Sequence, residues 1–151
     1  MMKVCIGGTF NVVHKGHKTL FEKAFEIAGK KGMVFIGVTT DKMAEQKRFM
    51  IPYEQRVNAI KTFLQSKGYQ NRYSIIPIHD IFGVAADGDY DAIIVSPETE
   101  ENAQAINKKR RKKGKKPLEI ITVPYILAED NTPIRATKIL ANDMDENGKI
   151  L

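Results

Sequence analysis

The sequence predicts an α/β protein in which helices flank a five-stranded parallel sheet, all within one domain over residues 1–151. Short apolar or β-branched runs alternate with segments of helical periodicity along the chain. Glycine or proline stands at many of the boundaries between them. The length suits one domain with a sizeable core, and no repeat or long linker divides it.

The first strand, helix and second strand come from the amino-terminal part of the chain. Residues 4–6 are a short apolar run typical of a buried strand. Beyond a glycine turn, apolar residues recur at helical spacing up to Ala28, and Gly29 predicts the helix end. Residues 33–40 are a β-branched and aromatic run, which predicts the second strand.

The rest of the chain repeats this alternation. Pro52 is tolerated near a helix start, and the next predicted helix carries one apolar face. Helices are predicted at 53–66, 98–113 and 133–142, and strands at 73–78, 92–95 and 118–123. Such strands pair in parallel through right-handed crossovers, which gives a Rossmann-like arrangement. Ligands of these sheets bind beyond the carboxyl ends of the strands.

The most informative motif is His14-Lys15-Gly16-His17, which follows the turn Gly7-Gly8-Thr9-Phe10 and opens the first helix. Unpaired backbone N–H groups and the helix dipole favour an anion at such a helix start. Two imidazoles can donate hydrogen bonds to phosphate oxygens and stabilise charge in a transition state. The motif therefore predicts phosphate chemistry.

The motif fits the common phosphate-binding loops poorly. Lys18-Thr19 follow His17, so the Gly-Lys-Thr run of a P-loop is absent, and the glycines do not fit G-x-G-x-x-G. Metal ligation by the two histidines stays open, although no cysteine, third histidine or paired carboxylate lies nearby. A structural role for the histidines as helix caps also stays open.

Composition indicates an ordinary globular protein, with 42% hydrophobic and 28% charged residues. No apolar run approaches the length of a membrane span and no signal-peptide pattern is visible, so a cytoplasmic protein without membrane contact is expected. Cys5 lies in the first predicted strand, where we expect it to pack as a small buried apolar residue.

Positive charge is concentrated in one basic run. Residues 108–116 hold eight Lys or Arg side chains, whereas the whole chain carries a net charge of +6, so the remainder is mildly acidic. No aromatic residue interrupts the run, so nucleic-acid binding is not expected. Two roles remain open for the run: solvated cations at a helix C-terminus, and attraction of a polyanionic nucleotide.

Several motifs together carry a resemblance to a known family. Gly7-Gly8-Thr9-Phe10 with His14-x-Gly16-His17 resembles the signature of the H-x-G-H nucleotidyltransferase superfamily. The later motifs are similar to those of the archaeal and eukaryotic branch of phosphopantetheine adenylyltransferase: Val95-Ser96-Pro97-Glu98-Thr99, Ile106-Asn107 with Arg110, Pro117-Leu118-Glu119-Ile120-Ile121, and Ala128-Glu129-Asp130. The resemblance covers essentially the whole chain. It implies transfer of AMP from ATP to 4′-phosphopantetheine, giving dephospho-coenzyme A and pyrophosphate in coenzyme A biosynthesis.

The resemblance implies roles for the residues of the first motif. His17 stabilises the pentacovalent phosphorus, and His14 helps to hold the phosphates. Thr9 orients the attacking phosphate, and the backbones of Gly8 and Phe10 lie against the nucleotide. Such catalysis is positioning plus neutralisation of charge.

Further site residues follow from the resemblance. Lys47 corresponds to a lysine that anchors the substrate phosphate, as suits an ammonium on a mobile stem. Nucleotide binding is implied for Ser96, Glu98, Arg110, Arg135 and Thr137. Magnesium is expected with ATP, held by phosphates and waters rather than by protein ligands.

The carboxyl-terminal motif departs from the family pattern Ile-Ser-Ser-Thr-x-Ile-Arg. Arg135 and Ala136 replace the two serines, Thr137 fits, and Leu140 replaces the closing arginine. Arg135 or Lys138 can supply the missing cation. An alternative register that uses Thr132 and Arg135 abandons the flanking Pro133-Ile134, so we prefer the first. The departure leaves reduced activity or a changed substrate open.

Two alternatives to the implied reaction therefore remain. One is the same chemistry on another phosphate acceptor, such as nicotinamide or flavin mononucleotide, or with CTP. The other is a non-catalytic regulator that binds a nucleotide or coenzyme A. The oligomeric state and the base selectivity leave no readable mark in the sequence.

Five other polar residues are expected to have simpler roles. Thr39, at the end of the second strand, either lines the acceptor side of the site or only finishes the strand. Arg56 is expected to pair with a carboxylate of its own helix. The acidic residues Asp143, Asp145 and Glu146 are expected to form a solvated tail.

Overall fold

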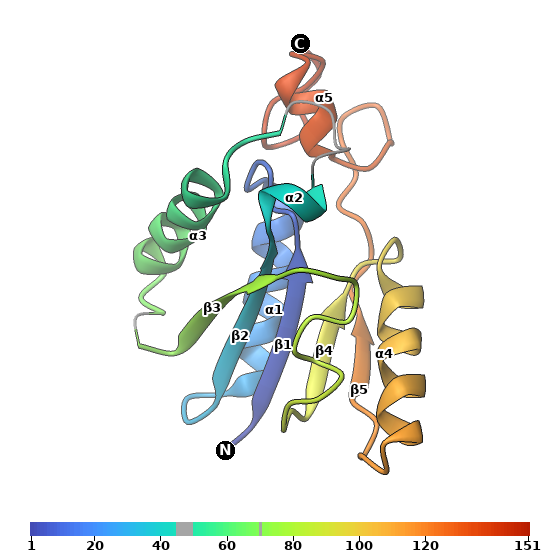
Figure 1. The fold of residues 1–151 in the computed structure, drawn as a ribbon. Coiled ribbons are helices and arrows are strands. Elements are labelled where there is room, and N and C mark those ends of the chain that lie inside the picture. The colour runs from blue at the N-terminus through green and yellow to red at the C-terminus, as the bar shows by residue number, and fades with distance from the viewer. Residues whose placement is uncertain (45–49, 70) are drawn as a thin grey trace.

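The computed structural model describes residues 1–44, 50–69 and 71–151. Strands and helices alternate along these residues, as the sequence predicts (Figure 1). The elements are β1 (Lys3–Gly8), α1 (Lys15–Ala28), β2 (Met33–Thr39), α2 (Asp41–Ala44), α3 (Tyr53–Ser66), β3 (Tyr73–Ile78), β4 (Ala92–Val95), α4 (Glu100–Lys112), β5 (Glu119–Thr122) and α5 (Ala136–Leu140).

The strands form a parallel sheet in the order β3-β2-β1-β4-β5. The predicted five-stranded, Rossmann-like sheet is therefore confirmed. From β1 the chain adds β2 and β3 on one side and then crosses to add β4 and β5 on the other, so the strand order reverses between β1 and β4. A site is expected beyond the carboxyl ends of these two strands.

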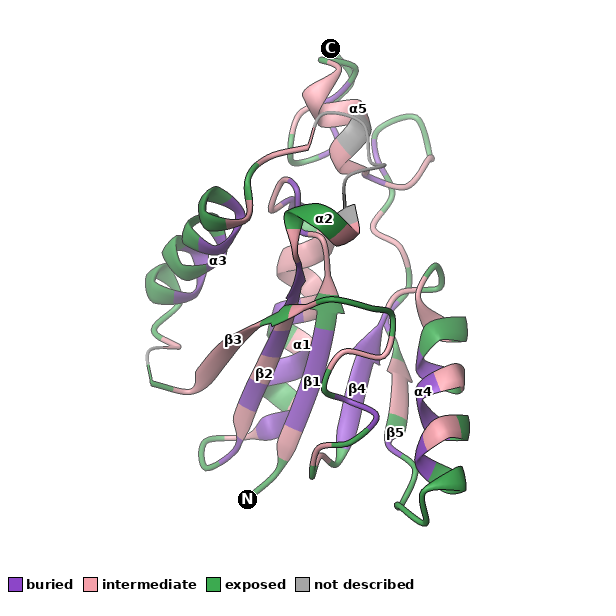
Figure 2. Cartoon of the chain, in the orientation of Figure 1, coloured by how far each residue is buried: buried purple, intermediate pink, exposed green. Residues whose placement is uncertain are grey.

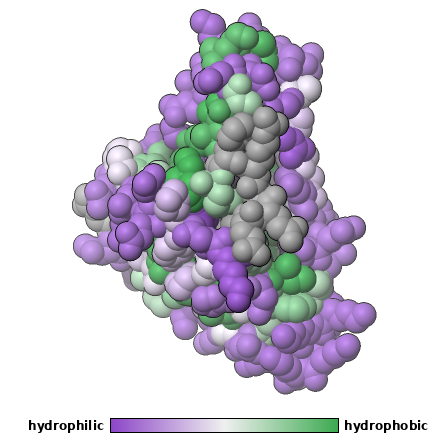
Figure 3. All heavy atoms as spheres, turned by 45° about the horizontal axis from the view of Figure 1, so that its top comes forward, coloured by the Kyte–Doolittle hydropathy of each residue, from purple (hydrophilic) through white to green (hydrophobic). Residues whose placement is uncertain are grey.

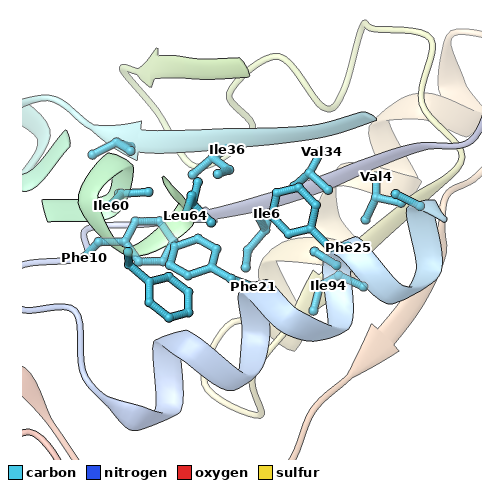
Figure 4. Close-up of a cluster of buried hydrophobic side chains, with 14 of the residues drawn as sticks. Val4, Ile6, Phe10, Phe21, Phe25, Val34, Ile36, Ile60, Leu64 and Ile94 are labelled. Atoms are coloured by element: carbon cyan, nitrogen blue, oxygen red, sulfur yellow. The ribbon is translucent and has the colours of Figure 1, made fainter. Parts of the chain in front are cut away.

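Helices cover both faces of the sheet. α1 and α3 pack on one face, where the large aromatic and aliphatic side chains of the main core meet (Figure 4). This core includes Phe21, Phe25, Ile36, Ile60, Leu64 and Ile94. α4 packs on the opposite face with a smaller cluster, which includes Ile93, Ala103 and Ile106. Figure 2 shows the consequence, since β1, β2 and β4 and the inward sides of the helices are the buried parts.

Cys5 is buried in the smaller cluster, as expected for a small apolar residue. Burial raises the pKa of its thiol to about 12. Because the thiolate is the reactive form, this cysteine is inert at neutral pH.

The basic run forms the last turn of α4 and the loop after it. This end of α4 lies at the amino-terminal edge of the sheet, away from the carboxyl ends of the strands (Figure 1). Cations there offset the helix dipole. The placement favours the role at the helix end over attraction of a nucleotide.

The last helix is shorter than predicted. The sequence predicts a helix over 133–142, whereas α5 spans Ala136–Leu140. Pro133 instead forms a β-bridge with Leu127. This pairing holds the chain extended before the helix begins.

The predicted solvated tail is wrong for the backbone. Met144 is 1% exposed and packs against Ala128 and Ile134. The carbonyl of Glu146 accepts a hydrogen bond from the N–H of Lys15 at 3.0 Å. The side chains of Asp143 and Glu146 are exposed, as expected, but the segment itself is folded against the start of α1.

Candidate active site

A cavity of about 480 Å³ lies beyond the carboxyl ends of β1 and β4. Its polar lining includes Thr9, Asn11, His14, His17, Thr39, Ser96, Glu98, Thr99, Asn102 and Arg135. Figure 3 tilts this end of the molecule toward the viewer and shows hydrophilic residues around the face, with smaller hydrophobic groups between them. The lining also includes apolar residues such as Ile6, Val95 and Val123, so the cavity combines polar and apolar groups, as small-molecule sites do.

His14 is the N-cap of α1. Its Nδ1 accepts hydrogen bonds from the N–H of Gly16 at 3.0 Å and of His17 at 3.4 Å. An accepting Nδ1 is unprotonated, so the neutral ring carries its proton on Nε2. The capping role considered for His14 is thus confirmed. It leaves the Nε2–H of this lining residue available as a hydrogen-bond donor.

His17 is fixed from the other side. Its Nδ1 lies 2.8 Å from the carbonyl oxygen of Val12. That distance identifies Nδ1 as the protonated nitrogen, because a carbonyl can only accept. A protonated Nδ1 has no lone pair to offer the His14 N–H, which lies 3.4 Å from the same atom. Nε2 of His17 gains a proton only when the ring becomes an imidazolium.

Both imidazoles are neutral at neutral pH. Burial lowers the pKa of His14 to about 4. Burial, and next the adjacent His14, lower the pKa of His17 to about 3. An anion in the cavity would favour the charged rings and reverse these shifts.

The glycine loop, residues 7–10, joins β1 to this helix start. Phe10 has a φ of +51°, a left-handed conformation that is uncommon for an aromatic residue. Its buried ring stacks on Phe21 at 5.1 Å and meets the edge of His17 at 5.0 Å. A Cβ at Gly8 would lie 3.1 Å from the Phe10 ring, so glycine suits this close approach. Backbone and side chain together shape the loop around the cavity.

Arg56 anchors the glycine loop. The expectation that it pairs with a carboxylate of its own helix is wrong. The guanidinium pairs with Asp41 of α2 at 3.0 Å, not with a carboxylate of α3. It also donates to the carbonyl of Thr9 at 2.8 Å and of Ile51 at 2.7 Å. Sequence periodicity missed this network because its members come from three separate segments: the glycine loop, α2 and the start of α3.

The opposite wall holds three further predicted residues. Ser96 follows β4, and its N–H donates to Thr99 Oγ1 at 3.1 Å. Glu98 Oε2 lies 3.2 Å from Arg135 Nη1, which joins the loop before α4 to the segment before α5. Both side chains are substantially exposed, so the ion pair contributes little to stability. The structure therefore brings Thr9, both histidines, Ser96, Glu98 and Arg135 to one cavity.

Arg110 is not brought to the cavity, which corrects the expectation that it contacts nucleotide. It is 3% exposed and does not line the cavity. Its guanidinium donates to the carbonyls of Lys116, Ala85 and Gly88 at 2.7–2.8 Å. Arg110 therefore ties α4 to the loop before β4.

Two predicted site residues have no described side chain. Lys47 lies outside the described residues. Thr137 lies in α5, and its side chain is likewise outside what the structure describes. Lys138 donates to Thr132 Oγ1 at 3.0 Å and does not line the cavity, so Arg135 is the described cation of this motif that does.

The cavity offers little for direct metal binding. Within residues 1–44, 50–69 and 71–151, no three His, Cys, Asp or Glu side chains are placed to hold an ion. Glu98 is the one carboxylate among the described lining residues.

Within residues 1–44, 50–69 and 71–151, no helix is both long enough and apolar enough to span a membrane.

Comparisons with known proteins agree with this geometry. A family model described as cytidylyltransferase-like matches residues 5–142. The chain is 44% identical over 151 residues to phosphopantetheine adenylyltransferase of Methanosarcina acetivorans, covering 99% of this chain and 96% of that protein. It is 38% identical to the enzyme of that name from Archaeoglobus fulgidus, covering 99% of this chain and 100% of that one.

Solved structures show the same fold. A protein of unknown function from Archaeoglobus fulgidus superposes with a TM-score of 0.74 at 38% identity, covering 81% of this chain and 89% of that one. Tyrosyl-tRNA synthetase from Aeropyrum pernix superposes with a TM-score of 0.67 at 13% identity, covering 91% of this chain and 57% of that one, and shares the fold alone. The chain belongs to the cytidylyltransferase-like family, in the branch that contains the archaeal phosphopantetheine adenylyltransferases.

Proposed function

We propose that this protein transfers AMP from ATP to 4′-phosphopantetheine, forming dephospho-coenzyme A and pyrophosphate. Near-full-length relatives bearing the name phosphopantetheine adenylyltransferase support this reaction. The single observation that carries it is the placement of His14, His17 and Thr9 around the start of α1, in one cavity with Arg135.

The reaction needs no covalent intermediate. A phosphate oxygen of the acceptor attacks the α-phosphorus of ATP, and the bond from that phosphorus to the pyrophosphate oxygen breaks. Negative charge gathers on the α-phosphate oxygens as the new bond forms. Catalysis is therefore positioning and charge stabilisation.

The chain's residues fit these tasks. His14 offers its Nε2–H to a phosphate oxygen, since capping occupies its Nδ1. His17, whose Nδ1 faces Val12, stabilises the pentacovalent phosphorus once phosphate charge favours its imidazolium. Thr9 orients the attacking phosphate. Arg135 binds the nucleotide phosphates that serines contact in the family pattern. Lys47 is proposed to anchor the acceptor phosphate.

Magnesium is proposed to enter with ATP. The single carboxylate of the described lining fits an ion held by phosphates and waters, with at most Glu98 beside it. Bound in this way, the ion neutralises phosphate charge.

A pyrophosphate-release assay tests the reaction. ATP should support release with 4′-phosphopantetheine and not with nicotinamide or flavin mononucleotide, and CTP should not replace ATP. His17→Ala should lower turnover by about a hundredfold or more while changing ATP affinity less. His79→Ala, at an exposed position, is the matched control.

The alternatives predict other results in that assay. Turnover with a different acceptor, or with CTP, would replace the proposed substrate pair. Binding of ATP or coenzyme A without turnover on any acceptor would support a non-catalytic regulator instead. Near-normal turnover of His17→Ala would defeat the role of that imidazole.

A further inference from the structure

A buried arginine contacts the glycine loop, and the proposed reaction gives it no role. The side chain of Arg56 is 0% exposed. Its guanidinium anchors the loop through the Thr9 carbonyl and pairs with Asp41. Arg56 does not line the cavity, so any effect on the reaction passes through a neighbour.

That neighbour is Thr39, at the end of β2. Arg56 Nη1 lies 3.3 Å from Thr39 Oγ1, and Thr39 Oγ1 lies 3.1 Å from Thr9 Oγ1. A guanidinium can donate but not accept. Thr39 Oγ1 therefore accepts from Arg56, which directs its own hydrogen to Thr9.

The direction of this hydrogen-bond chain continues to its last member. Because Thr9 Oγ1 accepts from Thr39, the hydrogen of Thr9 is left for an acceptor outside the hydrogen-bond chain. Thr9 and Thr39 both line the cavity. The hydroxyl of Thr9 is thus oriented to donate, which is the polarity that a phosphate oxygen requires.

We propose that Arg56 and Thr39 are positioning residues that fix Thr9 as a hydrogen-bond donor to the acceptor phosphate. This inference rests on the proposed function. A free hydroxyl can turn either a lone pair or its hydrogen toward an anion, whereas this hydrogen-bond chain removes the unfavourable choice before substrate binds. The buried cation at its start also polarises both hydroxyls toward the cavity.

Thr39→Val tests the hydrogen-bond chain, because valine keeps the shape of threonine and removes the hydroxyl. Turnover should fall about ten- to a hundredfold, the range for a lost hydrogen bond to a charged group, with little change in the KM for ATP. Thr39→Ser should retain turnover. Thr62→Val removes an exposed threonine hydroxyl that donates to the Asn58 carbonyl within α3, and is the matched control.

A double-variant cycle separates positioning from loosened structure. If Thr39 acts through Thr9, Thr39→Val should add little to the loss already caused by Thr9→Val. Arg56→Lys should behave likewise, because an ammonium cannot span the same acceptors. Arg72→Lys, at a partly buried arginine that bonds the Gly29 carbonyl, controls for general destabilisation.

The outcomes separate this inference from the proposed function. Wild-type turnover of Thr39→Val, or independent effects of Thr39→Val and Thr9→Val, would overturn the hydrogen-bond chain and leave the reaction standing. If the wild type does not turn over 4′-phosphopantetheine, the proposed function fails. Calorimetry with inorganic phosphate then tests the hydrogen-bond chain: non-additive losses of affinity support it, and additive losses overturn it.

Discussion

The imidazole rings of His14 and His17 stack with their centroids 3.8 Å apart and their planes inclined by 20°. Two imidazolium ions this close would repel each other, and burial lowers the pKa of both rings. The site therefore places two neutral rings beside a cavity suited to an anion. Binding of a phosphate should raise the pKa of both rings.

Stability should fall in mild acid. The folded pKa values lie below the ordinary value of 6.5, so the unfolded chain binds more protons at low pH. Above pH 6.5 the two histidines should not lower the free energy of unfolding. As the pH falls from 6.5 toward 4, the free energy of unfolding should decrease. Urea unfolding across this window should show a loss of about 3 kcal/mol for each ring.

A matched variant isolates that contribution from the carboxylates. His14→Asn with His17→Gln places a good N-cap and a capping-box glutamine at these positions and removes both titrating rings. Its stability should decline less in acid than that of His79→Gln, which removes the exposed histidine. Equal declines would show that the ring pair is not protonated on unfolding.

Nucleotide binding should be accompanied by proton uptake at neutral pH. Phosphate charge in the cavity favours the imidazolium of His17, whose Nε2 carries no proton in the free site. Calorimetry of ATP binding in buffers of different ionisation enthalpy should give different apparent heats. His17→Gln should reduce that difference, and identical heats for the wild type would rule out the protonation.

The fold was predictable because its signals are local. Periodic apolar runs and the punctuating glycines identify each strand and helix, and alternation along the chain implies a parallel sheet. The H-x-G-H motif is also local, since four consecutive residues build the start of α1. The placement of both histidines at the cavity followed from that short segment.

Long-range polar contacts were not predictable in this way. Arg56 finds Asp41 and Thr39, and Arg110 finds Ala85, only after packing brings their segments together. A motif match marks such an arginine but does not distinguish a ligand contact from a buried brace. The docking of the tail depends on Met144, one apolar residue without helical or strand periodicity.

Arg110 should matter for stability and not for nucleotide affinity. Arg110→Met would leave three carbonyl acceptors without their donor, which should cost about 2–4 kcal/mol. Arg111→Met changes an exposed neighbour and should stay within about 0.5 kcal/mol. Thermal unfolding and ATP titration together decide the matter: a weaker ATP affinity at unchanged stability would restore a nucleotide-binding role.

The tail should govern the order of the helix start that carries the histidines. The Glu146 carbonyl bonds the N–H of Lys15, which lies between the two motif residues His14 and Gly16. Met144 holds that tail in place through its burial against Ala128. Met144→Ala should therefore cost about 2–5 kcal/mol and free the Lys15 amide.

Amide hydrogen exchange measures this coupling directly. The N–H of Lys18 bonds the His14 carbonyl within the helix, at 3.0 Å, and does not depend on the tail. In Met144→Ala the Lys15 amide should exchange faster relative to Lys18 than in the wild type, because local opening of the tail exposes it. Met2→Ala, at an exposed methionine, should leave that ratio unchanged. Parallel acceleration of both amides would instead mean that the tail and α1 open only with the whole protein.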